Sequence, residues 1–415
     1  MPRPIAIDLF AGAGGLSLGF EQAGFDIAAA VEIDPIHCAA HKFNYPYTTT
    51  ICKSVTEVDG DEICRKAGIG KKNIDVVFGG APCQGFSMIG KRALDDPRNS
   101  LVHHFVRIVL ELQPKYFVFE NVRGLTVGNH RTFLQEIIEA FEQADYQVPN
   151  HVGVLNAAEY GVPQDRKRLF LVGARKGLLL PDRPEKCDPV TVWEAIGDLP
   201  EAEDYPELIN RDWVHATYGE ASAYARKLRG LDNAPGNYGY RREFNRDVLT
   251  SSLRAEHTPL SRKRFAETLP GKTEPVSRFH KLDPNGVCNT LRAGTASDRG
   301  AFTSPRPIHP ITPRCITVRE AARLHSYPDW FRFHATKWHG FRQIGNSVPP
   351  LLAQAVADQI AKALEVSRSA PNETLKLGDT SLLELNMSAA SSMFGVPHNV
   401  IPKRVRMIIA EEANV

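Results

Sequence analysis

The stretch Ile74-Asp-Val-Val-Phe-Gly-Gly-Ala-Pro-Cys-Gln-Gly-Phe-Ser-Met-Ile-Gly-Lys-Arg92 joins an apolar run to an abrupt stop. Residues 74–78 favour a buried strand, and the two glycines and the proline that follow end it. Cys83 should therefore lie just beyond the carboxyl end of a strand. In an open parallel α/β sheet this edge binds the ligands, so the thiol is expected to face a site and not the core.

The residues around Cys83 favour a chemical role over a structural one. A single cysteine is more often a small buried apolar residue. Here the segment that continues to position 92 is polar, basic and rich in glycine, and it includes Ser87, Lys91 and Arg92. Such a segment can form a loop that closes over an anionic partner.

A glycine turn near the N-terminus predicts a nucleotide site. The apolar run 5–10 passes into Ala11-Gly-Ala-Gly-Gly15, and a helical pattern follows, which is the arrangement that cradles nucleotides. Ser17 stands where the dinucleotide fingerprint has a third glycine, so NAD and FAD are disfavoured. After a predicted strand at 27–31, Glu32 can accept both hydroxyls of a ribose, although a solvated strand end would look the same.

Two further groups are expected at the edge that carries Cys83. Glu120 follows the predicted strand 115–119, at its carboxyl end. The pattern Gln164-x-Arg166-x-Arg168 leads into a predicted strand at 169–172, and its alternate side chains share one face. If that strand is antiparallel, its start meets the same edge. Basic clusters are usually solvated, but three converging side chains beside a thiol and a carboxylate suit phosphate or carbonyl binding.

The second half of the chain changes character. Residues 174–313 mix prolines, charges and aromatics with little periodicity, which predicts a smaller, irregular domain. Its basic and aromatic residues suit contacts to phosphates and bases, with a solvated loop-rich domain equally open. The pattern Thr317-x-x-Glu320 predicts a capping box at a helix start. An apolar face over 351–364 predicts another helix, with Ser347 as its cap.

Length and composition set broad limits. A chain of 415 residues exceeds one typical domain. A net charge of +2 is too small to indicate nucleic-acid binding by itself. The seven cysteines show no metal-binding spacing, which favours a reducing compartment and no structural metal. We find neither a leader peptide nor an apolar run of the ~18 residues that a membrane span needs, and we expect a cytoplasmic protein with no membrane partner.

The motifs together resemble one enzyme family. Pro82-Cys-Gln84 after two glycines, Glu120-Asn-Val122, the Gln-x-Arg-x-Arg triplet and Gly345-Asn-Ser-Val348 match the ordered motifs of the DNA cytosine-5 methyltransferases. The resemblance implies an α/β fold, a Rossmann-like S-adenosylmethionine-dependent methyltransferase sheet with a smaller, irregular target-recognition domain. It divides the chain into a cofactor-binding and catalytic domain at 1–173, a recognition domain at 174–313, a return to the catalytic domain at 314–365, and an extension of unknown role at 366–415.

The resemblance also implies roles for single residues. Cys83 would add to cytosine C6, Glu120 would grip the base, and Arg168, with Arg166 nearby, would contact the base and align the carboxylate. Ser54 stands where the family usually has an acidic residue for the adenine amine. The implied S-adenosylmethionine site comprises Phe10, Ala11, Gly12, Gly14, Gly15, Glu32, Ile33, Ser54, Val55, Asn346 and Ser347. The implied DNA contacts are Ser87, Lys91, Arg92, Thr290 and Leu291.

The expected function is sequence-specific methylation of a flipped-out cytosine in double-stranded DNA. We expect a monomer, with a companion restriction endonuclease as a further partner. A tRNA cytosine methyltransferase stays open within the same architecture, although the long segment 174–313 favours duplex DNA. An inactive cofactor-binding subunit is disfavoured by intact Cys83, Glu120 and Arg168, and a nicotinamide dehydrogenase by Ser17.

Overall fold

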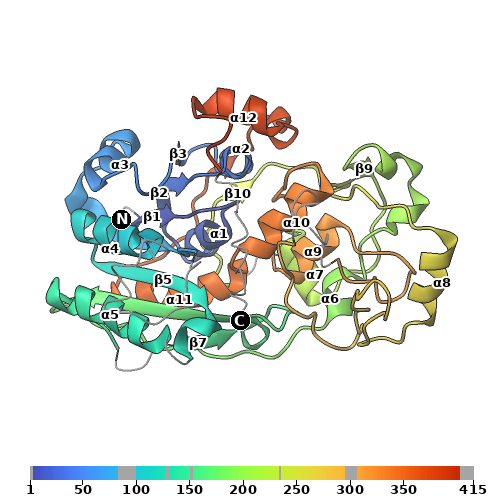
Figure 1. Cartoon of the computed structure of the whole chain (residues 1–415), viewed down its shortest axis with the longest axis horizontal. Helices are drawn as coiled ribbons and strands as arrows, with labels where there is room; N and C mark the ends of the chain where they lie inside the picture. The colour runs from blue at the N-terminus through green and yellow to red at the C-terminus, as the bar shows by residue number, and fades with distance from the viewer. Residues whose placement is uncertain are drawn as a thin grey trace, which may run out of the picture.

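The fold is organised around one mixed β-sheet (Figure 1). The computed structural model describes residues 3–82, 100–127, 130–149, 153–232, 235–294 and 306–401. The strand order is β3-β2-β1-β4-β5-β8-β6, and β7 also pairs with β8. The first five strands of this order are parallel, whereas β8 is antiparallel to β5, β6 and β7. The strands are β1 (Ile5–Leu9), β2 (Asp26–Glu32), β3 (Thr49–Cys52), β4 (Ile74–Gly79), β5 (Tyr116–Val122), β6 (Tyr146–Gln147), β7 (Gly153–Asn156) and β8 (Lys167–Arg175).

Helices cover both faces of this sheet, which explains why its central strands β1, β4 and β5 are mostly apolar. In β4, Val77 packs into one core while Val76 and Phe78 pack into the other. The first core includes side chains of α3 (Gly60–Ala67), α4 (Ser100–Leu112) and α5 (His130–Gln143). The second includes α1 (Gly15–Gln22) and α11 (Pro350–Ala363), so the chain returns to this sheet near its C-terminal end. An α/β sheet of the predicted class is therefore confirmed.

The middle of the chain is irregular and lies beside the sheet, on the right of Figure 1. Its interior combines an apolar cluster with buried ion pairs: Arg323 Nε lies 2.5 Å from Asp329 Oδ1, and Arg314 Nη2 lies 2.7 Å from Glu320 Oε1. Its helices are α6 (Val192–Ile196), α7 (Ala223–Leu228), α8 (Pro259–Glu267), α9 (Val318–Leu324) and α10 (Lys337–Asn346). Its two-residue strands are β9 (Val214–His215), β10 (Arg241–Arg242) and β11 (Val248–Leu249).

Of the two predicted helix starts, the capping box at Thr317 is confirmed and the cap at Ser347 is not. The capping box is present, because Thr317 Oγ1 accepts the Glu320 N–H and Glu320 in turn accepts the Thr317 N–H. Ser347 as the cap of the last predicted helix was wrong. It ends α10, which the sequence did not predict because its glycines and polar residues leave little apolar periodicity. Ser347 Oγ donates to the Ile344 carbonyl at 2.8 Å, and α11 starts at Pro350 with Pro349 at its cap.

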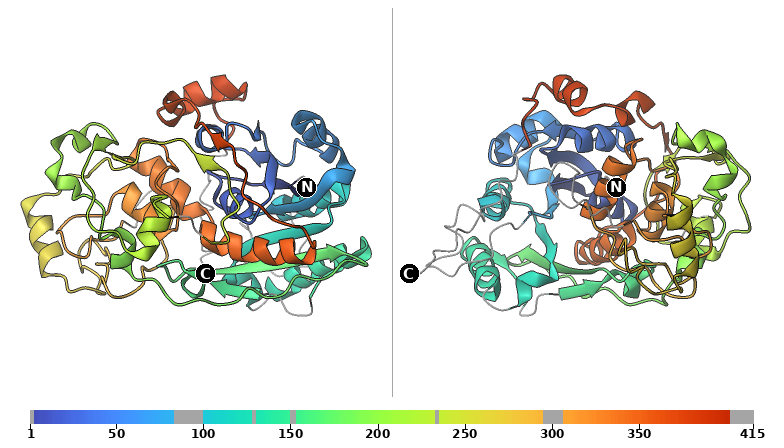
Figure 2. Two further views of the ribbon diagram at one scale, coloured as in Figure 1. Left: turned by 180° about the vertical axis from the view of Figure 1, so that it is seen from behind. Right: turned by 45° about the vertical axis from the view of Figure 1, so that its right-hand side comes forward.

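The extension after α11 is ordered from residue 366 to 401 and reaches the blue N-terminal part of the fold (Figures 1 and 2). It contains β12 (Thr374–Leu375), the 3-10 turn η9 (Thr380–Leu383) and α12 (Met387–Phe394), which packs on α2 (Pro35–Asn44). No helix in the described ranges has both the length and the apolar character needed to cross a bilayer. The remaining 3-10 turns are η1 (Lys71–Asn73), η4 (Arg123–Thr126), η5 (Ala157–Tyr160), η6 (Ala202–Asp204) and η7 (Pro206–Ile209).

Candidate active site

Glu120 and Arg168 form an ion pair at the carboxyl edge of the parallel strands. Strand β8 runs antiparallel to β5, as the triplet required, and Arg168 stands opposite Val122 in the register. Arg168 Nε lies 3.0 Å from Glu120 Oε1, and both side chains are largely buried. The pair therefore presents a carboxyl group whose orientation is held by a charged partner.

The surroundings of Glu120 change its acidity. Burial raises the pKa of its carboxyl group, and the positive charges of Arg168 and Arg166 oppose this, leaving the pKa above the ordinary value. Such a carboxyl group holds a proton closer to neutral pH than a solvated glutamate does. It can therefore donate as well as accept hydrogen bonds toward a substrate.

The segment that leads to Cys83 passes directly over Glu120. Strand β4 lies beside β5 in the sheet. A Cβ atom built on Gly80 would lie 2.5 Å from Glu120 Oε2, so only glycine fits there without displacing the carboxylate. Asn121 Nδ2 donates to the Ala81 carbonyl at 3.0 Å, which holds the segment in place. Pro82 is the last residue described, and Cys83, Ser87, Lys91 and Arg92 lie outside the described residues.

Arg166 faces backbone carbonyls and not Glu120. Its guanidinium donates at 2.8 Å to the carbonyls of Leu291, Gly345 and Ser347, and the side chain is 1% exposed. Gln164, Arg166 and Arg168 were expected to converge at this edge, but among the described residues only Arg168 pairs with Glu120. Because Arg166 and Gln164 precede the first residue of β8, the alternation of a strand does not govern where they point.

Gln164 joins Arg166 in tying distant segments together. Its Nε2 donates to the Leu324 carbonyl at 3.2 Å, and its Oε1 accepts the Leu291 N–H at 3.0 Å. Leu291 is consequently buried, at 3% exposed, and its side chain contributes to a core. Thr290 is half-buried, and its hydroxyl donates to the Asp165 carbonyl at 2.6 Å. Thr290 and Leu291, two of the predicted DNA contacts, therefore offer no free side chain in this structure.

The glycine turn after β1 lies at the same edge, one strand away from β4. Phe10 and Gly12 both adopt left-handed backbone angles, with φ of 62° and 56°. The Gly12 N–H donates to Glu32 Oε2 and the Asp34 N–H donates to Oε1, each at 2.8 Å. A Cβ on Gly12 would meet nothing within 4 Å, so the turn is open on that side. Glu32 is thus held in position next to free space.

Ser347 and Val348 close the other side of the turn. A Cβ on Gly15 would lie 2.4 Å from the Val348 carbonyl oxygen and 3.0 Å from Ser347 Cβ, so the close approach requires glycine. At Gly14, with φ of 100°, a Cβ would lie 2.5 Å from Tyr45 Cε2. Asn346 is exposed beside this contact and Ser347 is half-buried.

The segment after β3 lies near Glu32 and carries the predicted residues Ser54 and Val55. Ile33 and Ser54 are half-buried, and the Lys53 N–H donates to the Glu32 carbonyl at 3.0 Å. Ser54 Oγ bonds the Thr56 hydroxyl at 2.8 Å. Val55 is buried, and its carbonyl accepts a bond from Arg107 at 2.8 Å. Ile33 and Ser54 are thus brought to the Glu32 side of the turn, while the Val55 side chain belongs to the core.

Asp8 was missed by the sequence analysis. It lies in β1 with 0% exposure, and Ser17 Oγ donates to its Oδ2 at 2.6 Å. Burial raises the pKa of Asp8 to about 8, with the Ser17 bond opposing the shift. Its Oδ1 has no hydrogen-bond partner among the described residues. The signal available in the sequence was an acidic residue inside an apolar strand, which needs a reason to be buried.

These observations fit S-adenosylmethionine. The cofactor has a ribose that Glu32 can bind, and a charged amino acid part suited to a polar glycine turn. The open space at Gly12 would admit it without a clash.

Comparisons with known proteins identify the family. Residues 5–362 match the family model described as C-5 cytosine-specific DNA methylase. The Type II methyltransferase M.XorII of Xanthomonas oryzae pv. oryzae is 68% identical over 408 residues, which cover 98% of this chain and 96% of the relative. M1.HphI of Haemophilus parahaemolyticus, also a Type II methyltransferase, is 37% identical over 363 residues, covering 86% of each chain.

Solved structures share the fold. A crystal structure described as a prophage-encoded DNA modification methyltransferase of E. coli superposes with a TM-score of 0.72 at 35% identity, covering 87% of this chain and 99% of that one. The Dnmt2 methyltransferase of S. pombe, at 16% identity and a TM-score of 0.54, supports the fold alone. The sheet, the Glu120 and Arg168 pair and the match over residues 5–362 lead to one conclusion: this chain belongs to the C-5 cytosine-specific DNA methylase family.

Proposed function

We propose that this DNA (cytosine-5)-methyltransferase is sequence-specific and transfers a methyl group from S-adenosylmethionine to C5 of a cytosine in duplex DNA. The observation that carries the proposal is the edge shared by β1, β4 and β5. The glycine turn follows β1, the segment toward Cys83 follows β4, and the Glu120 and Arg168 pair lies on β5 and its neighbour. A methyl donor and a reactive base would meet at this shared edge.

Cys83 would supply the nucleophile. Cytosine C5 is too electron-poor to take a methyl group directly, so a bond from the thiolate to C6 must first raise its electron density. An unperturbed thiol has a pKa of ~8.5, and the positive charge of Arg168, at the sheet edge where β4 ends, would favour the thiolate. S-adenosylmethionine supplies the methyl group as a sulfonium. Loss of the C5 proton and departure of the Cys83 sulfur then restore the aromatic ring.

Glu120 would stabilise the charge that this addition creates. Attack at C6 pushes electrons toward N3, and a carboxyl group with a raised pKa can donate a hydrogen bond or proton there. Stabilisation that grows as charge develops accelerates the step, whereas equal binding of ground and transition state does not. Arg168 would hold this carboxyl in place. Arg166 would position the surrounding backbone, which makes it a positioning residue and not a group that touches the base.

The base would have to leave the helix before reacting. Both faces of its ring are needed, one for sulfur and one for the methyl donor, and unstacking costs a few kcal/mol. We assign DNA contacts to the segment 85–92 and to the recognition domain 174–313, with the domain boundaries as predicted from the sequence. The relatives are named Type II methyltransferases, so we also propose a restriction-modification setting and a companion endonuclease. As the sequence led us to expect, we further propose a monomeric, cytoplasmic enzyme.

Methyl transfer by a Cys83→Ala variant tests this proposal. With labelled S-adenosylmethionine and genomic DNA, the variant should show no transfer, while calorimetry should show unchanged binding of S-adenosylhomocysteine. Cys187→Ala removes an exposed free thiol and serves as the matched control with full activity. A parallel reaction on tRNA and bisulfite sequencing of the DNA would identify the substrate. Full activity of Cys83→Ala, or transfer to tRNA alone, would refute the assignment.

A further inference from the structure

The extension beyond residue 365 has a role that the family match does not cover, because that match ends at residue 362. We propose that residues 366–401 form a clasp that holds α2 and α10 together and thereby positions the two sides of the cofactor pocket. The proposal rests on the S-adenosylmethionine site assigned above. Figure 2 shows the extension crossing from α11 to the outer surface of α2.

The clasp begins at the end of α11 and is anchored on the irregular part of the chain. Arg368 pairs with Asp358, and its guanidinium carbon lies 4.6 Å from the centre of the Tyr238 ring. Strand β12 then pairs in parallel with β10, where Leu375 stands beside Arg242. The Glu243 N–H donates to the Leu375 carbonyl at 2.9 Å.

The next contact is with α2. The Gly378 N–H donates to the Phe43 carbonyl at 2.8 Å, and a Cβ on Gly378 would lie 2.9 Å from Phe43 Cα. Leu382 and Leu383 pack into one apolar cluster with Phe43 and its helical neighbours Ala39 and Ala40. Burying two leucines removes enough apolar surface from water to hold a short segment on a helix.

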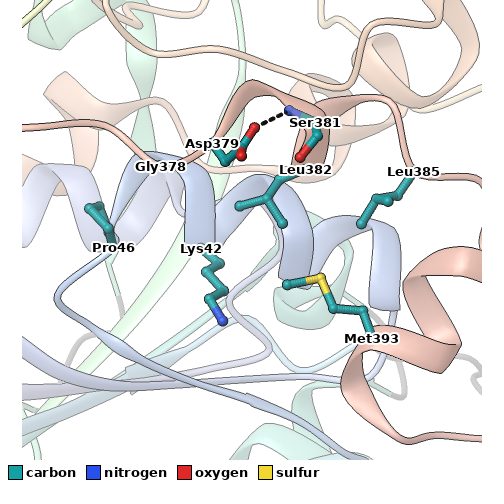
Figure 3. Close-up of a pocket in the computed structure, with 8 residues that line it drawn as sticks. All are labelled: Lys42, Pro46, Gly378, Asp379, Ser381, Leu382, Leu385 and Met393. Atoms are coloured by element: carbon teal, nitrogen blue, oxygen red, sulfur yellow. Dashed lines mark hydrogen bonds between the residues drawn. The ribbon is translucent and has the colours of Figure 1, made fainter.

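A cavity beside this contact shows how the extension lies over α2. Figure 3 shows its lining residues, among them Leu382, Leu385 and Met393 from the extension and Lys42 from α2. The cavity measures about 380 Å³. Met393 is 44% exposed at its rim, whereas Leu383 is 1% exposed beneath the extension. Leu382 both packs on α2 and lines the cavity, whereas Leu383 belongs to the buried contact alone.

The 3-10 turn η9, which carries Leu382 and Leu383, also contacts the residues just before α10. The Ala335 N–H donates to the Leu383 carbonyl at 2.8 Å, and a ring nitrogen of His334 lies 3.0 Å from the Leu385 carbonyl oxygen. These residues lie immediately before Thr336, which caps α10. The turn η9 therefore contacts the C-terminal part of α2 and the N-terminal end of α10 at once.

The other ends of these two helices carry the proposed cofactor residues. Helix α2 is capped by Asp34, two residues after Glu32, and α10 ends at Asn346. Near the pocket the helices are joined by Arg342 Nη1, which lies 2.5 Å from Asp34 Oδ2. The pair is thus fixed at both ends, by this ion pair beside the pocket and by η9 away from it. Loosening η9 should let the helices shift and misalign Glu32 against Asn346.

Leu383→Ala in the full-length protein tests the clasp. Coupling between separate sites typically amounts to 5–150-fold in affinity, so the Kd for S-adenosylhomocysteine should rise about tenfold. The KM for S-adenosylmethionine should rise with it, while kcat at saturating cofactor and the Kd for DNA should stay within about twofold of wild type. Met393→Ala, on the same extension but exposed, is the matched control and should behave as wild type.

Two further variants keep the test decisive if Leu383→Ala folds poorly. Leu383→Met keeps an apolar side chain of similar volume and should restore cofactor binding. Gly378→Ala should loosen the same contact from the backbone side. Unchanged cofactor affinity, despite faster hydrogen exchange in residues 380–394, would refute the clasp. Equal losses of cofactor and DNA affinity would mean that the extension stabilises the whole fold and does not position the cofactor pocket, which would also refute the clasp. If the wild-type protein fails to bind S-adenosylhomocysteine, the cofactor assignment fails instead.

Discussion

Gly80→Ala should disable Glu120 without unfolding the protein. The added Cβ would lie 2.5 Å from Glu120 Oε2, whereas ordinary contacts begin at 3.4 Å. The carboxylate would therefore have to move by roughly 1 Å, a displacement that typically costs about 100-fold in rate at a reacting group. Its 3.0 Å contact with Arg168 would stretch or break as it moves. We expect kcat/KM to fall about 100-fold, equivalent to about 2.7 kcal/mol of transition-state stabilisation.

Stability and binding should change much less in this variant. The obstacle is the end of one side chain and not the backbone, so we expect about 1 kcal/mol of destabilisation, the low end for overpacking. Single-turnover methyl transfer on genomic DNA, calorimetry with S-adenosylhomocysteine and urea denaturation would separate the three quantities. The loss should appear in the transfer rate, with cofactor affinity close to wild type.

Gly124→Ala is the matched control. It adds the same methyl group just beyond β5, where the nearest atom would be Val122 Cγ2 at 3.9 Å, and it should keep full activity. If Gly80→Ala were as active as this control, the position of the Glu120 carboxylate would not matter for the reaction. The reasoning that assigns Glu120 to the base would then be refuted.

Three other perturbations test the buried groups. Gly15→Ala, whose Cβ would lie 2.4 Å from the Val348 carbonyl oxygen, should weaken S-adenosylhomocysteine binding at least about tenfold, and calorimetry showing wild-type affinity would contradict this. Burial alone would raise the pKa of Glu320, but Arg314 leads the contacts that lower it from 4.5 to about 2. This stabilisation, about 3 kcal/mol, is present above pH 4.5 and is lost toward pH 2, so Glu320→Gln should flatten that slope in urea titrations. Burial raises the pKa of Asp8 from 3.8 to about 8, so its contribution is complete below pH 3.8 and is lost as pH rises to 8. Asp8→Asn should therefore unfold at higher urea than wild type at pH 8, and equal midpoints there would show that Asp8 ionises freely in the fold.

Local patterns in the sequence were sufficient for the elements that build the site. The strand at 74–78, its glycine stop and the capping box at Thr317 were predicted, because alternation, chain breaking and capping depend on neighbouring residues. The strand pattern placed Glu120 at this edge and Arg168 beside it if the next strand is antiparallel, and the antiparallel β8 and their 3.0 Å contact confirm this. Cys83 stays a prediction from the sequence, because it lies outside the described residues.

The sequence by itself determined the sheet, the glycine turn and the chemical character of the site. Only the tertiary structure decided that Arg166 binds the carbonyls of Leu291 and Gly345, which are 125 and 179 residues away in the chain. It also decided that Ser347 ends a helix and that residues 366–401 brace α2. Such partners cannot be read from spacing, because a side chain outside a regular element points wherever packing leaves a polar group to satisfy.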